Sequence, residues 1–370
     1  MQSLDEKEWR EFDFEEIFDI RKGFYNKKPE SSGEGTIPFL GATDSNNGVT
    51  RFLTYQEIDS SSKTGDMHNS PIEKKLFPGH AIAVTNNGSV GHAYYQATEF
   101  TCSHDINPLY LRDHEMNRDE ADFLIKAIEE QGKLFQYARK WRPIRMVKSK
   151  IMLPVNDAGE PDYEYMAEYT RQKRNAMLDK YREYAEERVA ELGDIVDIPA
   201  LDEKEWKPIK LSLLGQVSSG RDIYASERVP GDTPYITSGS QNNGIGYFVG
   251  NSNDTLDSNY IAFNRNGAVG KAFYHSYKSL LGNDCRKLHL SHWDNNKFVG
   301  IFIATSISMQ SECFSYSRKL GTARANQLQI MLPVDDVGEP DYAYMEQYAK
   351  NMMLRKYRQY LAFLERDAEE

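Results

Sequence analysis

Cysteine is scarce in this chain of 370 residues, which has only Cys102, Cys285 and Cys313 and no CxxC pair. Such an odd and sparse set argues against a disulfide framework and is typical of a reducing compartment. No apolar run reaches the roughly 20 residues that span a bilayer, and the charged start MQSLDEKEWR lacks the apolar core of a signal peptide. We therefore expect a cytoplasmic protein without a membrane segment.

Catalytic and metal-binding motifs are also missing. The sequence contains no P-loop, GxSxG elbow, HExxH helix or Rossmann glycine pattern, and its eight histidines do not cluster with cysteines or acids at metal-ligand spacing. Residues 107–110, Asn-Pro-Leu-Tyr, are similar to the Asn-Pro-Pro-Tyr of amino-methyltransferases but lack the second proline and a preceding glycine-rich cofactor loop. These absences predict a chain that is not an enzyme and holds neither metal nor cofactor.

The net charge of −11 argues against a protein that coats nucleic acid non-specifically. The length is enough for two or three domains, each with its own core, and the 23 tyrosines argue against disorder.

One phrase occurs twice. Residues 151–169 read IMLPVNDAGEPDYEYMAEY and residues 330–348 read IMLPVDDVGEPDYAYMEQY, which is identical at 14 of 19 positions. DEKEW also occurs twice, before each copy, and NNGSVGHAYY from Asn86 pairs with RNGAVGKAFY from Arg265. The order is the same in both halves, so the chain is an internal duplication.

Each half begins with a globular part of mixed α/β (α+β) class. Residues 81–84 and 260–263 resemble strands between Asn-Gly and Gly-rich turns, and residues 123–128 and 298–307 resemble helices. The Met-Leu-Pro-Val strand should lie at a sheet edge, because proline cannot donate to a ladder.

A long helix should follow each globular part. Glu160, Pro161 and Asp162 favour a helix start at Tyr163, and about 30 residues make a rod of about 45 Å. Apolar side chains three and four residues apart predict one seam along each rod: Met166, Tyr169, Met177 and Tyr181, then Met345, Tyr348, Met352 and Tyr357. We expect the rods to pair as an antiparallel coiled coil that relates the globular parts by an approximate two-fold; the alternative is that the helices are ordinary linkers.

Polar loops in each half could address DNA bases. Asn and Gln carry a paired donor and acceptor that fit an adenine edge in the major groove, and Arg fits guanine. The alternative is that Asn-Asn-Gly only forms a turn, which would explain Asn47, Gly48, Asn243 and Gly244 without a role in binding. The base-contact candidates are Thr43, Ser45, Asn46, Asn86, Asn87, Ser240, Gln241, Asn242 and Arg265.

A basic stretch lies inside this acidic chain. Residues 133–150 hold seven Lys or Arg and no acid, and phosphate binding is a natural use of such a stripe, although a solvated face is the common alternative. The phosphate candidates are Arg139, Lys140, Arg142 and Arg145, with Arg318, Lys319 and Arg324 in the second half.

The chain has two globular units, and each is followed by a nearly identical helix. The phrase LPV-x-D-x-GEPDY-x-YM joins each unit to its helix. In this order and in this phrase the chain resembles the specificity (S) subunits of type I and BcgI-like type IIB restriction-modification systems. The resemblance covers the whole chain. It implies two target recognition domains, 1–155 and 199–334, and two spacer helices, 156–198 and 335–370. Each domain would read one half of a bipartite double-stranded DNA target in the major groove, with half-site centres about one helical turn apart.

The resemblance also implies partners. The paired helices would fix the spacer and dock DNA methyltransferase subunits, two in number, together with restriction or translocase subunits in some systems. S-adenosylmethionine and Mg would belong to those partners, and this chain would hold no cofactor. Two other classes remain open: a free-standing sequence-specific regulator that binds an interrupted site alone, and a scaffold without a DNA role.

Overall fold

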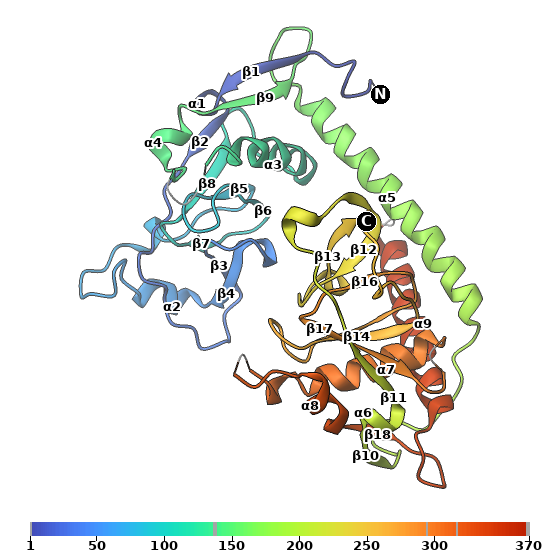
Figure 1. Ribbon diagram of the computed structural model, residues 1–370. Helices are drawn as coiled ribbons and strands as arrows, with labels where there is room; N and C mark the ends of the chain where they lie inside the picture. Colours follow the sequence, from blue (N-terminus) through green and yellow to red (C-terminus); the bar gives the residue numbers. More distant parts are fainter. Residues whose placement is uncertain (1, 136–138, 294, 316, 368–370) are drawn as a thin grey trace. The chain divides into compact units, whose positions relative to one another are not determined.

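The computed structural model describes residues 2–135, 139–293, 295–315 and 317–367 (Figure 1). Residues 1 and 368–370, at the ends of the first and last predicted segments, lie outside it. The chain divides into two compact units, residues 1–180 and 181–370, and the division falls within one long helix.

The first repeat contains three small sheets. Four antiparallel strands follow the order β2-β8-β5-β6, three strands follow the order β4-β3-β7 with β3 and β7 parallel, and β1 pairs with β9. The strands are β1 (Trp9–Asp13), β2 (Phe18–Ile20), β3 (Ile37–Leu40), β4 (Val49–Leu53), β5 (Ala81–Thr85), β6 (Ala93–Gln96), β7 (Thr101–Cys102), β8 (Ile106–Leu111) and β9 (Lys150–Pro154).

The second repeat has the same topology strand for strand: β11-β17-β14-β15, β13-β12-β16 and β10-β18. Its strands are β10 (Trp206–Lys210), β11 (Gly215–Ser219), β12 (Pro230–Ile236), β13 (Ile245–Val249), β14 (Tyr260–Asn264), β15 (Ala272–His275), β16 (Leu280–Leu281), β17 (Cys285–Leu290) and β18 (Gln329–Pro333). The predicted duplication and the mixed α/β class are confirmed.

The helices also correspond. The first repeat has α1 (Phe14–Ile17), α2 (Tyr55–Ser60), α3 (Arg118–Gly132), α4 (Pro143–Met146) and α5 (Tyr163–Leu192); the second has α6 (Leu211–Leu214), α7 (Lys297–Met309), α8 (Thr322–Gln327) and α9 (Tyr342–Asp367). Among the described residues, the α-helix without a counterpart is α2, since the chain between β13 and β14 forms no helix there. No helix in the described part of the chain is long and apolar enough to cross a membrane.

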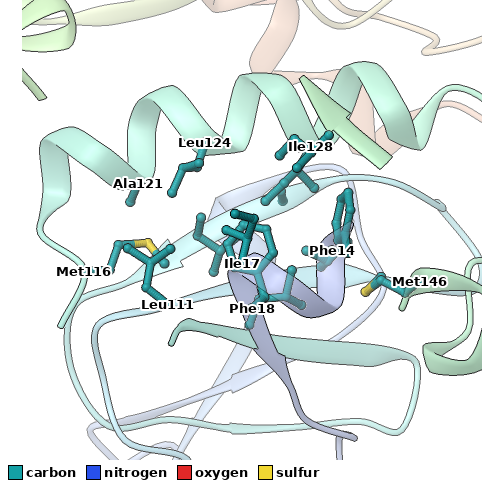
Figure 2. Close-up of a cluster of buried hydrophobic side chains, with 14 of the residues drawn as sticks. Phe14, Ile17, Phe18, Leu111, Met116, Ala121, Leu124, Ile128 and Met146 are labelled. Atoms are coloured by element: carbon teal, nitrogen blue, oxygen red, sulfur yellow. The ribbon is translucent and has the colours of Figure 1, made fainter. Parts of the chain in front are cut away.

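The core of the first repeat lies between α3 and the four-stranded sheet. Ala121, Leu124 and Ile128 of α3 occupy one helical face and point toward Phe14 and Phe18, as Figure 2 shows. All five side chains are fully buried. Helix α3 begins where Asn117 accepts a hydrogen bond from the Glu120 N–H, while the Glu120 carboxylate accepts one from the Asn117 N–H.

The twice-used phrase forms the joint between each globular part and its long helix. Strands β1 and β9 pair antiparallel, Gly159 turns the chain at φ 79°, and the Asp162 carboxylate accepts a hydrogen bond from the Tyr165 N–H at 3.0 Å. In the second repeat β10 pairs with β18, Gly338 has φ 88°, and Asp341 accepts from the Tyr344 N–H at 2.9 Å. Each aspartate thus caps its helix.

An ion pair ties each joint to the start of its repeat. Lys7 Nζ lies 2.7 Å from Asp162 Oδ2, and Lys204 Nζ lies 2.8 Å from Asp341 Oδ2. Burial alone would raise the pKa of each carboxyl, but the hydrogen bonds from the lysine and the backbone N–H, with the lysine charge, outweigh it and lower the pKa. Both aspartates therefore remain ionised and capped at neutral pH.

The predicted helix seam is correct only in its later part. Within the second unit, Tyr181 of α5 packs edge-on against Tyr360 of α9 at 4.6 Å, and Tyr184 packs against Tyr357 at 6.1 Å. Because residue numbers rise along one helix as they fall along the other, the two segments are antiparallel.

The assignment of four other side chains to that seam is wrong. Met166 and Met345 belong to the hydrophobic cores of their own repeats, and Tyr169 and Tyr348 pack against Phe123 and Phe302 of α3 and α7, the helices of the globular parts. The globular part still covers the first turns of each helix, so the three-and-four spacing continues the domain core there. Of the remaining two, Met177 is 71% exposed and Met352 lies beside α7 in an apolar groove.

We predict that Asp162→Ala will lower the free energy of unfolding by about 2 kcal/mol, because it removes a helix cap and leaves the largely buried Lys7 ammonium without its partner. Urea unfolding at pH 7 measures the change. Asp157→Ala, an exposed aspartate in the same loop, is the matched control, and an equal loss in both variants would contradict the capping role.

We predict that His275 makes the second repeat sensitive to mild acid. Its ring is fully buried, and burial lowers its pKa to about 4. The unfolded chain, with the ordinary pKa near 6.5, takes up the proton first, so stability is lost as pH falls from about 6.5 toward 4. His275→Gln, which copies the aligned Gln96 of the first repeat, should reduce the loss between pH 7 and pH 5 by about 2 kcal/mol. Identical pH profiles of urea unfolding for the two proteins would refute this.

Candidate nucleic-acid interface

The first polar loop is the hairpin turn of the three-stranded sheet. It joins β3 to β4 in the first repeat and β12 to β13 in the second, and each turn contains two asparagines with positive φ, at 52° and 51° for Asn46 and Asn47 and at 50° and 54° for Asn242 and Asn243. Asparagine tolerates this left-handed conformation. The turn interpretation of the Asn-Asn-Gly motif is therefore confirmed.

The exposed side chains of this loop lie around the turn. Asn47 is used internally, since its Nδ2 donates to the Tyr95 carbonyl at 3.0 Å. Among the described residues, the side chains of Asn46 and Gln241 are exposed and have no hydrogen-bond partner. Thr43 and Ser45 contact one another through their hydroxyls at 3.1 Å. Ser240 and Asn242 are also exposed.

The second polar loop, which begins at Asn86, contains a correction. Asn86 is buried, and its Nδ2 donates to Asn107 Oδ1 at 2.9 Å and to the His104 carbonyl at 3.2 Å. It is therefore a structural residue, and its assignment as a base contact is wrong. Its side chain follows a fully buried strand directly, so the sheet encloses it.

Asn87 also supports the loop. Its Nδ2 donates to Asp105 Oδ1 at 2.9 Å, and the aligned Asn266 makes the same contact with Asp284 at 3.3 Å. Because the contact occurs in both repeats, it favours a structural role for Asn87. Arg265, in contrast, is partly exposed, with Nη2 3.6 Å from Asp284 Oδ1.

The basic segment of each repeat is anchored on this second loop. Trp141 is fully buried, its backbone N–H donates to the Asn86 carbonyl at 3.2 Å, and its Nε1 donates to Ser149 Oγ at 2.9 Å. In the second repeat the Leu320 N–H donates to the Arg265 carbonyl at 3.1 Å. The cations on either side of these anchors are thus held beside the second loop.

Some cations of the basic segments make contacts within their own repeat, and others are exposed. Arg145 Nη1 donates to the Lys140 carbonyl at 2.8 Å, and Arg324 makes the equivalent bond to Lys319, so these arginines also brace their own segments. Arg139 lies over the Phe135 ring at 5.1 Å. Arg142 and Lys148 are exposed and, like Arg318, pair with no carboxylate among the described residues.

The two loops meet in each repeat. Tyr94 OH donates to the Thr43 carbonyl at 2.9 Å, and a Cβ added to Gly88 would lie 3.3 Å from that of Ala42. In the second repeat the Ala268 N–H donates to the Ser238 carbonyl at 3.3 Å. The two polar loops and the basic segment therefore form one continuous edge, called here the loop–basic edge.

One supporting position was not predicted from the sequence. Asn107, which holds Asn86, aligns with Arg286, and Arg286 Nε donates to Thr322 Oγ1 at 2.8 Å at the start of α8. Burial first, and repulsion from Arg265 second, lower the pKa of Arg286. Asn107 and Arg286 each link the four-stranded sheet of their repeat to the loop–basic edge. The sequence feature that could have identified them is that an amide in β8 aligns with a guanidinium in the otherwise similar β17.

The edge contains no feature of a metal centre. No group of three or more His, Cys, Asp or Glu side chains in the described segments is placed to hold a metal ion. What the edge offers is exposed amides, hydroxyls and guanidinium groups, which can bind base edges and phosphates.

Comparisons with known proteins agree with this chemistry. The model of the type I restriction modification DNA specificity domain matches the chain twice, at residues 6–179 and 203–360. The specificity subunit S.BcgI of a type II restriction enzyme from Heyndrickxia coagulans is 28% identical over 280 residues, which are 76% of this chain and 80% of that protein.

The fold has a counterpart among solved structures. The crystal structure of a type I restriction-modification S subunit from M. genitalium superposes with a TM-score of 0.52 at 18% identity, over 98% of this chain and 95% of that one. The two family matches together span most of the chain. The chain therefore belongs to the type I restriction modification DNA specificity family, whose members supply DNA sequence specificity to a restriction-modification complex and are not its catalytic components.

Proposed function

We propose that each repeat of this specificity subunit reads one half of a bipartite double-stranded DNA target. The observation that carries the proposal is the loop–basic edge, which consists of two polar loops and a basic segment in both repeats but differs in several exposed side chains. Ser45 aligns with Gln241, and Thr43 aligns with Gly239. Two domains that recognise different half-sites need a similar loop arrangement to dock on DNA and different side chains to contact the bases.

In this proposal, the globular part before each joint recognises DNA and the helix after it acts as a spacer. Residues 1–155 and 199–334 are the two target recognition domains, and residues 156–198 and 335–370 are the spacer helices whose pairing fixes the distance between half-sites. Two DNA methyltransferase subunits complete the complex and carry S-adenosylmethionine and Mg. The exposed cations at Arg142, Lys148 and Arg318 contact phosphates, while Ser45, Asn46 and Gln241 face base edges.

Methylation mapping tests this function and gives a residue-level prediction. The chain is expressed with the methyltransferase encoded beside it in a host that lacks DNA methylation, and modified adenines are located by sequencing. We expect a two-part site with a fixed gap. Gln241→Ala should relax base preference in one half only, and Ser45→Ala in the other, because each side chain belongs to a different repeat.

The same experiment has a clear negative result. Modification that is unchanged when this chain is omitted would refute the proposal. Tight binding of an interrupted site by the chain alone, without modification, would favour a free-standing regulator.

A second prediction concerns phosphate contacts. The double variant Arg142→Ala and Lys148→Ala should weaken binding of the assembled complex to all sequences about equally. It should also lower the slope of log Kd against log salt by about 0.9 for each lost phosphate contact. Fluorescence anisotropy at several salt concentrations measures both effects. Lys74→Ala, which removes an exposed cation elsewhere in the first repeat, is the control, and a salt slope unchanged in the double variant would exclude these phosphate contacts.

A further inference from the structure

A buried histidine and an exposed tyrosine support the first polar loop of the second repeat. His275, the last residue of β15, is fully buried, and Tyr277, two residues later, is 37% exposed. His275 Nδ1 lies 3.1 Å from Tyr277 OH, and Asn243 Nδ2 donates to the same hydroxyl at 3.1 Å. Asn243 is a positive-φ asparagine of the turn between β12 and β13. These hydrogen bonds therefore lead from the interior of the sheet to the loop–basic edge.

The first repeat supports the equivalent turn without a hydroxyl group. Asn47 Nδ2 donates to the Tyr95 carbonyl at 3.0 Å, and Gln96, which aligns with His275, donates through Nε2 to the Asn47 carbonyl at 3.2 Å. Thr98, an exposed residue, aligns with the tyrosine. The turn is thus held in both repeats, and the tyrosine hydroxyl is an addition of the second repeat.

The surroundings of His275 determine which of its ring nitrogens carries the proton. Burial lowers the pKa of the ring to about 4, so at pH 7 the ring is neutral and has one N–H and one bare nitrogen. Nε2 is buried and has no hydrogen-bond partner in the described part of the chain. A proton on Nε2 would leave a buried donor unpaired, which is rare in folded proteins. The proton therefore lies on Nδ1, which donates to the Tyr277 hydroxyl.

The Tyr277 hydroxyl consequently accepts two hydrogen bonds, one from His275 and one from Asn243. The orientation of the Asn243 amide agrees with the first repeat, where the Asn47 amide faces a carbonyl and must donate. A hydroxyl has one proton and two acceptor positions, and here both acceptor positions are occupied from within the protein. Its proton is left for an acceptor outside the protein, so the exposed hydroxyl acts as a fixed donor.

The acceptor edges of DNA bases fit such a donor. In the major groove guanine, adenine and thymine each present an acceptor atom, whereas cytosine presents only an amino donor. Phosphates attract cations more strongly than neutral hydroxyls, and the exposed Lys278 lies next to Tyr277 in the sequence. The exchange of Tyr277 for Thr98 between the repeats is also what two different half-sites require. A base is therefore the better partner for the hydroxyl.

We propose that Tyr277 is a specificity-determining residue of the second repeat, whose hydroxyl donates to a base acceptor in the major groove and rejects cytosine on the strand that it contacts. His275 and Asn243 are positioning residues, because they act through the hydroxyl and not on the DNA. This inference rests on the proposed function and gives one position of one half-site its chemistry.

Methylation mapping of Tyr277→Phe is the first test. The full chain, wild-type or variant, is co-expressed with the methyltransferase encoded beside it, and methylated sites are sequenced. We expect the wild-type complex to disfavour cytosine at one position of one half-site. The variant should accept cytosine there about fivefold more often, because it lacks one neutral hydrogen bond, and should leave the other half-site unchanged. A merely structural role would lower methylation at all sites without changing the preference.

A DNA analogue separates direct contact from a shift of the turn. At the relaxed position, the favoured base is replaced by a deazapurine or a pyrimidinone that lacks the major-groove acceptor. This change should raise the Kd of the wild-type complex about fivefold and leave the Kd of Tyr277→Phe unaltered. An equal effect on both complexes would overturn the contact. Weaker binding of Tyr277→Phe to all sequences alike would place the hydroxyl on a phosphate and would also overturn it.

Two further measurements test the positioning residues. Asn243→Gly keeps the positive-φ backbone but removes the amide, so it should relax the same preference, and adding it to Tyr277→Phe should relax the preference no further. Nitrogen NMR of the full chain should find the proton of His275 on Nδ1. A proton on Nε2 would mean that Tyr277 donates inward, which would overturn the proposal.

A control and the wild-type complex complete the design. Tyr247→Phe removes another exposed tyrosine hydroxyl of the same repeat and should keep the wild-type preference. If Tyr277→Phe also keeps that preference, this inference fails and the proposed function stands. A wild-type complex that methylates no bipartite site would overturn the proposed function, and this inference with it.

Discussion

The ion pair between a lysine near the start of each repeat and the aspartate that caps its long helix is the contact on which the architecture depends. Lys7 and Asp162 are 155 residues apart in the sequence but in contact in the fold, and Lys204 and Asp341, 137 residues apart, make the same contact. The aspartate caps the long helix and the lysine lies just before the first strand of the repeat, so the ion pair holds the start of the helix beside the start of its repeat. Tyr165 and Tyr344 add a second tie through hydroxyl bonds to the Gln2 and Pro199 carbonyls. The phrase is nearly identical in both copies because these contacts tolerate little change.

Sequence reasoning succeeded where local chemistry determines the structure. Positive φ at Asn46 and Asn47 follows from turn preferences, and the start of α5 at Tyr163 follows from the Pro-Asp pair before it. The reasoning failed where a side chain's role depends on what covers it. Met166 and Tyr169 have the spacing of a helix seam, but that spacing cannot distinguish a partner helix from the domain on which the helix rests. Asn86 is buried because β5 and β8 pair and bring Asn107 beside it, a long-range contact that no window of sequence contains.

Equivalent elements of the two repeats keep the same arrangement although different side-chain contacts hold them together. Arg171 of α5 pairs with Asp119 of α3 in the first repeat, whereas the aligned Lys350 of α9 lies over the Phe298 ring of α7 at 5.2 Å in the second. An ion pair and a cation–π contact thus hold equivalent helices together. Asn107 and Arg286 likewise support equivalent loops with different groups. The scaffold accepts such exchanges as long as the loop–basic edge keeps its shape, so its exposed residues can change without loss of the fold.

The charge distribution explains why a chain that reads DNA can be acidic overall. Non-specific affinity for DNA grows with the number of phosphates that a protein neutralises. Here the exposed cations of the loop–basic edge are few, and the chain carries a net charge of −11, so we expect weak attraction to arbitrary sequences. Under the proposed function, weak background binding increases the relative weight of the base contacts.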